Sequence, residues 1–375
     1  MTILQPSPAQ APAGARLRRV AALALASIAA LLASAPAART APPADFVGVT
    51  SEDVFAGSAS YRSANLSAQR GLGVGLIRQT FDWSQIELGP GRFDLGYHDD
   101  YVATAAAHGI RILPILFNPP RFQLGRTSGR AACAPRGFRT FARFAKVLVR
   151  RYGPQGSLWA ERPALPKLPI RSWQIWNEPN LGIYWCNQSS ARQYVRMLRA
   201  VGGAIEKVDR KAEIVTAGLP PSKLSSAIPL ERYIAQMYRA GARRAFDTMA
   251  INSYATDRRE LRTLLRGIRR QMDRRGHRRA RIWITELGWG DAGPAHRFVV
   301  GPTGQAARIS SSFREIARLR RKLRLRGVVY YSWRDSPPYP PLYRDMWGLH
   351  TGLLDAGAHP KPAYFAFRDA VTRLR

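Results

Sequence analysis

Eight short apolar runs, separated by segments of helical pattern, constrain the fold of this chain more than any other feature. Each run is rich in Val, Ile and aromatic residues, and most are nearly continuous in apolar character, which is typical of parallel strands buried on both faces. We predict strands over Phe46–Thr50, Val74–Phe81, Ile110–Phe117, Ile170–Trp176, Glu213–Gly218, Thr248–Ser253, Arg281–Thr285 and Gly327–Trp333.

Helical patterns occupy most of the segments between these runs. The candidates are Asp99–His108, Gly137–Tyr152, Ser190–Val208, Pro229–Ala240, a basic helix within Arg258–Arg281, Gln305–Leu325 and Lys361–Arg373. Strands alternating with helices, eight times over, predict an α/β fold, a closed (β/α)8 or TIM barrel. An open doubly wound sheet competes with it, but such a sheet usually has a Gly-rich turn after its first strand. Gly71, Gly73 and Gly75 precede a strand instead.

Residues 38–375 are predicted to form a single domain. Hydrophobic residues make up 46% of the sequence and charged residues 22%, which favours a packed core over disorder. No Ser/Thr/Pro linker divides this part of the chain. The longest insertion, Pro154–Pro169, is Pro-rich and is predicted to be a surface loop.

Residues 1–37 have the pattern of a secretory signal peptide. Arg16, Arg18 and Arg19 precede an apolar run from Val20 to Leu32, and Ala35-Pro36-Ala37 offers a cleavage site after Ala37. The run is short for a membrane-spanning helix. We therefore expect a secreted or extracytoplasmic protein with no transmembrane segment after cleavage, and an uncleaved N-terminal anchor is the alternative.

The chain has two cysteines, Cys133 and Cys186. Outside the cytoplasm such a pair is expected to form a disulfide, because a structural zinc site needs about four ligands. No His or Cys cluster has the spacing of metal ligands, so we predict no metal and no cofactor. The Gly-x-Ser-x-Gly elbow of esterases is also absent.

The formal net charge is +33, and removal of the three signal-peptide arginines would leave +30. Such a charge could attract an anionic polysaccharide, a cell envelope or nucleic acid. The arginines are spread over many segments, which favours a generally solvated surface over one dedicated binding arm. No specific nucleic-acid partner is predicted.

Two glutamates stand at the ends of predicted strands, where (β/α)8 enzymes carry their chemistry. Glu178 lies in Trp176-Asn177-Glu178-Pro179 after the fourth strand, and Glu286 lies in Thr285-Glu286-Leu287-Gly288 after the seventh. A carboxylate beside a buried strand is costly unless it is paired or functional. Two carboxyl groups are also the minimum equipment for cleaving a glycosidic bond.

These two segments resemble the strand-four and strand-seven signatures of the clan A glycoside hydrolases. Phe81-Asp82-Trp83 with Ile86-Glu87 and Gly91-Arg92-Phe93 is similar to the loop after strand two in families 5, 39 and 42. Gly352-Leu353-Leu354 and His359-Pro360-Lys361-Pro362-Ala363 resemble their C-terminal closure. The resemblance covers nearly the whole chain after residue 37, and it implies a retaining mechanism.

The resemblance also implies a role for each matching residue. Glu178 would be the general acid/base and Glu286 the nucleophile. The residues that would support them or bind the sugar are Arg78, Asn177, Tyr254 and Trp333. Trp333 would form the aromatic floor of the sugar subsite, often preceded in these families by a non-proline cis bond, here between Ser332 and Trp333. We also expect Trp289 to line the cleft, because it follows a strand and aromatic faces stack on sugars.

One position departs from the family pattern. Many clan members have His two residues before the Tyr, whereas this chain has Asn252, which could hydrogen-bond a sugar hydroxyl or the acid/base. The leading hypothesis is a secreted retaining hydrolase of β-linked oligo- or polysaccharides. The alternative is a barrel that has lost catalysis and binds an anionic polysaccharide or cell-envelope polymer through its basic surface.

Overall fold

The computed structural model describes residues 41–125, 132–336 and 345–375. The predicted signal peptide, residues 1–37, lies outside these ranges. Pro42–Arg375 forms one compact unit. Within the described ranges, no helix is both long and apolar enough to cross a membrane.

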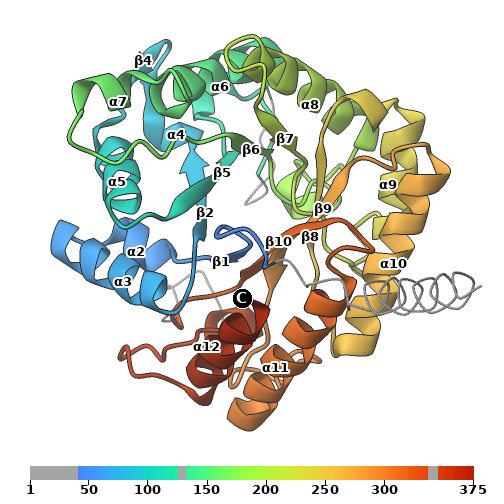
Figure 1. The fold of residues 1–375 in the computed structure, drawn as a ribbon. Coiled ribbons are helices and arrows are strands. Elements are labelled where there is room, and N and C mark those ends of the chain that lie inside the picture. Colours follow the sequence, from blue (N-terminus) through green and yellow to red (C-terminus); the bar gives the residue numbers. More distant parts are fainter. Residues whose placement is uncertain (1–40, 126–131, 337–344) are drawn as a thin grey trace, which may run out of the picture. The chain divides into compact units, whose positions relative to one another are not determined.

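Eight parallel strands close into a barrel, which confirms the predicted fold (Figure 1). Around the barrel the order is β1-β10-β9-β8-β7-β6-β5-β2, so each strand neighbours the next barrel strand along the chain. The strands are β1 Val47–Val49, β2 Leu76–Asp82, β5 Arg111–Phe117, β6 Ser172–Ile175, β7 Glu213–Val215, β8 Thr248–Asn252, β9 Arg281–Leu287 and β10 Leu325–Tyr330.

Helices surround the barrel, and a small hairpin follows β2 (Figure 1). The hairpin pairs β3 Glu87–Gly89 with β4 Arg92–Phe93. The α-helices are α2 Glu52–Ala56, α3 Ala59–Gly71, α4 Trp83–Ile86, α5 Gly96–Ala107, α6 Phe138–Tyr152, α7 Ser157–Glu161, α8 Ala191–Glu206, α9 Leu230–Arg239, α10 Arg258–Arg274, α11 Gly301–Leu319 and α12 Pro362–Leu374. Short 3-10 turns are η1 Arg121–Gln123, η2 Gly182–Tyr184, η3 Ala242–Arg244 and η4 Trp347–His350.

All eight predicted strands are present, but four α-helices were not predicted, namely α2, α3, α4 and α7, of which α3 and α7 are the most instructive. The inner face of α3 buries Arg62 and Gln69 beside Leu66, so its apolar periodicity in the sequence is weak. The segment Pro154–Pro169, predicted as a surface loop, contains α7, whose Leu158 and Trp159 are buried. In both segments the tertiary environment decides the structure more than the local pattern.

The barrel interior is layered, because alternate residues of each strand point inward. An apolar layer of Leu76, Leu113, Val215, Ala250, Trp283 and Val329 forms a separate cluster inside the larger core. Two residues further along three of these strands come Arg78, Asn252 and Tyr331. The apolar layer therefore supports a polar layer at the carboxyl ends of the strands.

Candidate active site

The structure brings the two predicted glutamates together at the carboxyl end of the barrel. Glu178 follows β6 and is 9% exposed, and Glu286 lies in β9 and is 8% exposed. Asn252, at the end of β8, donates its Nδ2 group to Glu178 Oε1 at 2.7 Å and to Glu286 Oε1 at 2.9 Å. The two carboxyl oxygens can therefore lie no further apart than the sum of these distances, 5.6 Å.

Three side chains donate hydrogen bonds to Glu286. Arg78 Nη1 lies 2.7 Å from Glu286 Oε1 in an ion pair that is almost completely buried. The Tyr254 hydroxyl donates to Glu286 Oε2, and Asn252 supplies the third donor. A positive charge and donors directed at a carboxylate stabilise its ionised form.

Arg78 is itself held in place by two neighbours. Its Nε donates to Gln174 Oε1 at 2.7 Å, and its Nη2 donates to Asn177 Oδ1 at 2.9 Å. Gln174 is fully buried in β6 and donates in turn to the Thr216 carbonyl at 3.1 Å. Sequence reasoning missed Gln174, although a polar residue inside a buried strand is the signal that could have found it.

Glu178 has an unusual protonation equilibrium. Burial, and secondly the negative charge of Glu286, raise the pKa of Glu178 to about 8, against the smaller opposing effects of Asn252 and Arg78. The Glu178 carboxyl group is therefore mostly protonated at neutral pH, while Glu286 is held by a guanidinium. Two carboxyl groups in such different environments are suited to acid and nucleophile roles.

The Tyr254 hydroxyl keeps its proton at neutral pH and can therefore donate a hydrogen bond. Burial, followed by the charge of Glu286, raises the pKa of Tyr254 well above its ordinary value. Its ring packs edge-on against Trp347, with ring centres 5.0 Å apart. Trp347 is half-buried and also stacks on His296. Trp347 is thus an aromatic side chain packed on a ligand of Glu286, and it was not among the predicted site residues.

The backbone around Glu178 is strained. Trp176 and Glu178 have φ angles of 76° and 46°, in the left-handed region that side chains other than glycine rarely adopt. Backbone hydrogen bonds from Trp176 N to Leu116 O and from Glu178 N to Gly218 O hold this conformation. Strain of this kind persists where the surroundings over-determine it, and it is concentrated at functional sites.

Gly218 provides the space that Asn252 occupies. A Cβ atom at residue 218 would lie 2.1 Å from Asn252 Oδ1, far inside contact distance. The same oxygen accepts a hydrogen bond from Thr285 Oγ1 at 2.8 Å. The orientation of the Asn252 amide is thus fixed from both sides, and its Nδ2 group points at the two glutamates.

The structure corrects the predicted positions of two tryptophans and of the cis bond. Trp289 is completely buried, with its Nε1 donating to Ala255 O at 2.7 Å. Trp333 is 1% exposed, donates to Asn65 on α3 and packs on Tyr364 of α12. Neither ring is exposed at the barrel mouth, because burying these apolar rings between the barrel and the helices removes them from water, which is energetically favourable. The cis bond joins Tyr331 to Ser332, one residue before the predicted position.

Two further residues near the site were not predicted. Tyr331 directly follows β10, is half-buried and contributes to raising the pKa of Tyr254. Glu52, after β1, accepts hydrogen bonds from Gln79 Nε2 at 2.6 Å and Thr80 Oγ1 at 3.3 Å. Desolvation by surrounding protein raises the pKa of Glu52, although its side chain keeps contact with solvent. The Glu52 carboxyl group thus has protein packed around it, while part of the side chain remains accessible to solvent.

The predicted disulfide is present. Cys133 and Cys186 are bonded, and they lie in the loops after β5 and β6. Backbone hydrogen bonds join the same loops, from Ala132 N to Ile183 O at 2.7 Å and from Cys186 N to Ala132 O at 2.8 Å. Among the residues that the structure describes, no group of three or more His, Cys, Asp or Glu side chains could hold a metal ion.

No protein-family model and no curated protein matches the sequence, but solved structures match the fold. A family 39 glycoside hydrolase from Bacteroides cellulosilyticus WH2 has a TM-score of 0.64 at 18% identity, over 90% of this chain and 64% of that chain. A monomeric beta-xylosidase from Caulobacter crescentus CB15 has a TM-score of 0.63 at 16% identity, over 88% and 68%.

A GH53 catalytic domain from Ignisphaera aggregans adds a third likeness, with a TM-score of 0.59 at 20% identity over 87% of this chain and 96% of that one. This chain thus spans about two thirds of the length of the first two structures and nearly all of the third. At such low identity the likeness establishes the fold. The chain therefore has a (β/α)8 barrel, the fold that it shares with these three structures.

Proposed function

We propose that this protein is a retaining glycoside hydrolase that cleaves β-linked oligo- or polysaccharides by double displacement. The observation that carries the proposal is the shared Asn252 contact, which limits the distance between Glu178 Oε1 and Glu286 Oε1 to 5.6 Å. Retaining enzymes have carboxyl groups about 5–5.5 Å apart, whereas inverting enzymes need about 6.5–9.5 Å to admit a water. The bound favours the retaining arrangement.

The contacts assign a role to each glutamate. Glu286 attacks the anomeric carbon while Glu178 donates its proton to the leaving oxygen, which gives a covalent glycosyl-enzyme and a free alcohol. Glu178, now ionised, then takes a proton from a water molecule that attacks the same carbon, and Glu286 leaves. The raised pKa of Glu178 suits the first step, and Arg78 and Tyr254 hold the Glu286 carboxyl group through an ion pair and a hydrogen bond.

The polar side chains around the pair would bind the sugar. Asn177 is half-buried, and its Oδ1 accepts from Arg78. Its amide nitrogen has no hydrogen-bond partner among the described residues, so we expect it to bind the 2-hydroxyl of the substrate. We expect Trp347, which packs on Tyr254, and Tyr331, which acts electrostatically on Tyr254, to contact the sugar ring. These assignments replace the predicted contacts of Trp289 and Trp333.

The two glutamates respond differently to substitution, and this tests the proposal. Glu286→Gln should abolish turnover of aryl β-glycosides. Glu178→Ala should retain the first step with activated aryl leaving groups, which need no proton, and azide should restore its turnover as a β-glycosyl azide. Wild-type activity in both variants would contradict the assignment.

We also propose that the protein is exported. The pattern of residues 1–37 supports export, and a disulfide is expected to persist only in an oxidising compartment. Export predicts that the N-terminus of protein recovered outside the cytoplasm is Ala38. A full-length chain in the cytoplasm would contradict it.

A further inference from the structure

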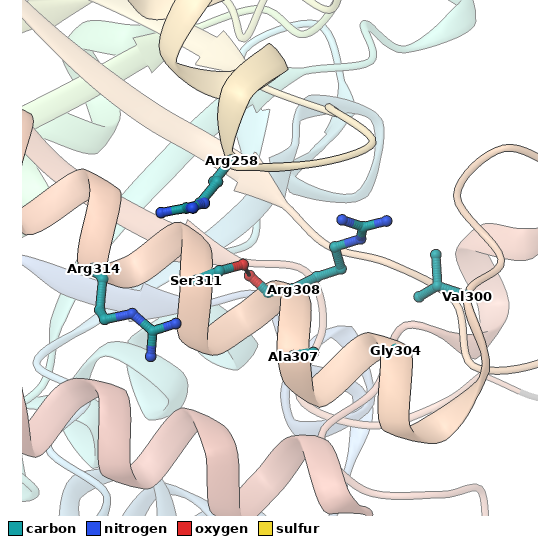
Figure 2. A pocket seen from close by; sticks show the side chains of 7 residues that line it. All are labelled: Arg258, Val300, Gly304, Ala307, Arg308, Ser311 and Arg314. Carbon is teal, nitrogen blue, oxygen red and sulfur yellow. Dashed lines mark hydrogen bonds between the residues drawn. The ribbon is translucent and has the colours of Figure 1, made fainter.

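A basic groove lies on the outside of the barrel, between the start of α10 and the length of α11 (Figure 2). Its volume is about 680 Å³, within the range of ligand pockets, about 300–1,000 Å³. Three arginines line it, Arg258, Arg308 and Arg314, together with Ser311 and the small or apolar residues Val300, Gly304 and Ala307. We call this feature the α10/α11 groove.

The spacing along α11 gathers these residues on one face. Gly304, Arg308 and Ser311 are four and three residues apart, and Arg314 follows three residues later, so their side chains share one side of the helix. Arg258, the first residue of α10, approaches from the other wall (Figure 2). Glycine and alanine on the same face leave the space that the long arginine side chains surround.

None of the three arginines has an ion-pair partner among the described residues, whereas neighbouring arginines are paired. Glu315 binds Arg262 at 2.8 Å and also binds Arg318, and Glu260 binds Arg297 at 2.7 Å. The acidic residues around the groove are therefore already engaged by other cations.

Asp257 is an acidic residue that interacts electrostatically with a groove arginine, Arg308. Backbone hydrogen bonds, the largest from Glu260 N–H, lower the pKa of Asp257, and the charge of Arg308 contributes a smaller part. Asp257 Oδ1 accepts those bonds as the N-cap of α10 and forms no ion pair with Arg308. The groove thus keeps three like charges in one hollow, an arrangement that an anion would stabilise.

We propose that the α10/α11 groove binds the carboxylates of an acidic polysaccharide at a distance from the reacting bond. Guanidinium groups bind carboxylates bidentately. The Ser311 hydroxyl donates to the Arg308 carbonyl at 3.2 Å, and its oxygen can still accept a hydrogen bond from a sugar hydroxyl. The choice of a polysaccharide rests on the proposed function. It is supported by position, because α10 follows the strand of Asn252 and α11 follows the strand of Glu286. No aromatic side chain lines the groove, so it lacks a platform on which nucleic-acid bases could stack.

The test compares two triple variants of the full-length protein that remove the same charge. R258Q/R308Q/R314Q removes the groove arginines, and R192Q/R196Q/R232Q removes three exposed arginines of α8 and α9. Affinity electrophoresis and calorimetry would measure binding to polygalacturonate, neutral xylan and a single-stranded DNA oligonucleotide at fixed salt. Turnover of a neutral aryl glycoside serves as a check on the active site.

The groove variant should bind polygalacturonate at least about tenfold more weakly than wild type, and the control variant should change little, because charge-assisted contacts exceed diffuse attraction. Both should keep wild-type aryl glycosidase activity. Equal losses in the two variants would overturn the proposal, and so would groove-dependent binding of DNA in preference to polygalacturonate. Glu286→Gln should bind polygalacturonate like wild type. Groove-dependent binding in a protein that hydrolyses no glycoside would refute the proposed function and leave the groove assigned.

Discussion

Replacing Glu178 with glutamine is expected to stabilise the protein, and increasingly so as the pH rises. Burial and the charge of Glu286 raise the pKa of Glu178 from near 4.5 to about 8 in the folded state. Between these values the folded protein keeps a proton that the unfolded chain releases. The stability that depends on this proton is complete below about pH 4.5 and is lost as the pH rises to about 8. Glutamine is neutral in both states and avoids this loss.

The size of the effect follows from the pKa shift. At about 1.36 kcal/mol per pKa unit, the penalty on folding grows from about 1 kcal/mol at pH 5 to about 5 kcal/mol at pH 8.5. For a folded unit of about 330 residues the entropy of unfolding is about 0.7 kcal/mol/K. The Tm of Glu178→Gln relative to wild type should therefore rise by about 5 °C between these pH values.

Differential scanning calorimetry of both proteins from pH 5 to pH 8.5 measures this difference. Glu231→Gln, the same change at an exposed position on α9, controls for the loss of a surface charge. A constant Tm difference between wild type and Glu178→Gln across this range would refute the reasoning. A difference that shrinks with rising pH would show that Glu178 is ionised in the folded protein.

Three other substitutions test the contacts that organise the site. Asn252→Ala removes a hydrogen-bond donor that lowers the pKa of Glu178. The alkaline limb of the pH profile of kcat/KM should therefore move to higher pH, and kcat should fall. An alkaline limb at the same pH as in wild type would mean that the Asn252 amide does not lower the pKa of Glu178. Gly218→Ala places a Cβ atom against Asn252 and should lower kcat at least tenfold. The control Gly203→Ala, in open space on α8, should leave kcat unchanged. Equal kcat values for the two variants would show that Gly218 is not needed to make room for Asn252. Cys133→Ser combined with Cys186→Ser removes the disulfide, which joins residues 53 positions apart in the sequence. The free energy of unfolding, measured by urea titration, should fall by up to about 4 kcal/mol. An unchanged midpoint would show that the backbone hydrogen bonds alone hold the two loops together.

Much of the fold could be predicted because the signal is repeated along the chain. The eight strands are buried on both faces, so each appears as an apolar run, and the helices between them mostly bury one apolar stripe. The helix α3 was not predicted because it buries Arg62 and Gln69, polar residues that interrupt the apolar pattern expected on the inner face of a helix.

The glutamate pair, Arg78, Asn177, Asn252 and Tyr254 could be located because strand ends and family motifs specify their positions. The aromatic residues could not, since a tryptophan after a strand faces either the barrel mouth or the helices. Trp289 and Trp333 face the core, and Trp347, which packs on Tyr254, begins the short 3-10 turn η4, whose sequence has no periodic pattern.

Covalent trapping of the glycosyl-enzyme tests directly whether Glu286 is the nucleophile. A panel of aryl 2-deoxy-2-fluoro-β-glycosides slows the second step, so the glycosyl-enzyme accumulates and can be located by peptide mass spectrometry. We expect a fluoro sugar to become attached to the peptide containing Glu286, specifically at that residue, and the labelling to be lost in Glu286→Gln. Labelling at Glu178 or at Glu52, or turnover that releases the sugar with inverted anomeric configuration, would contradict it.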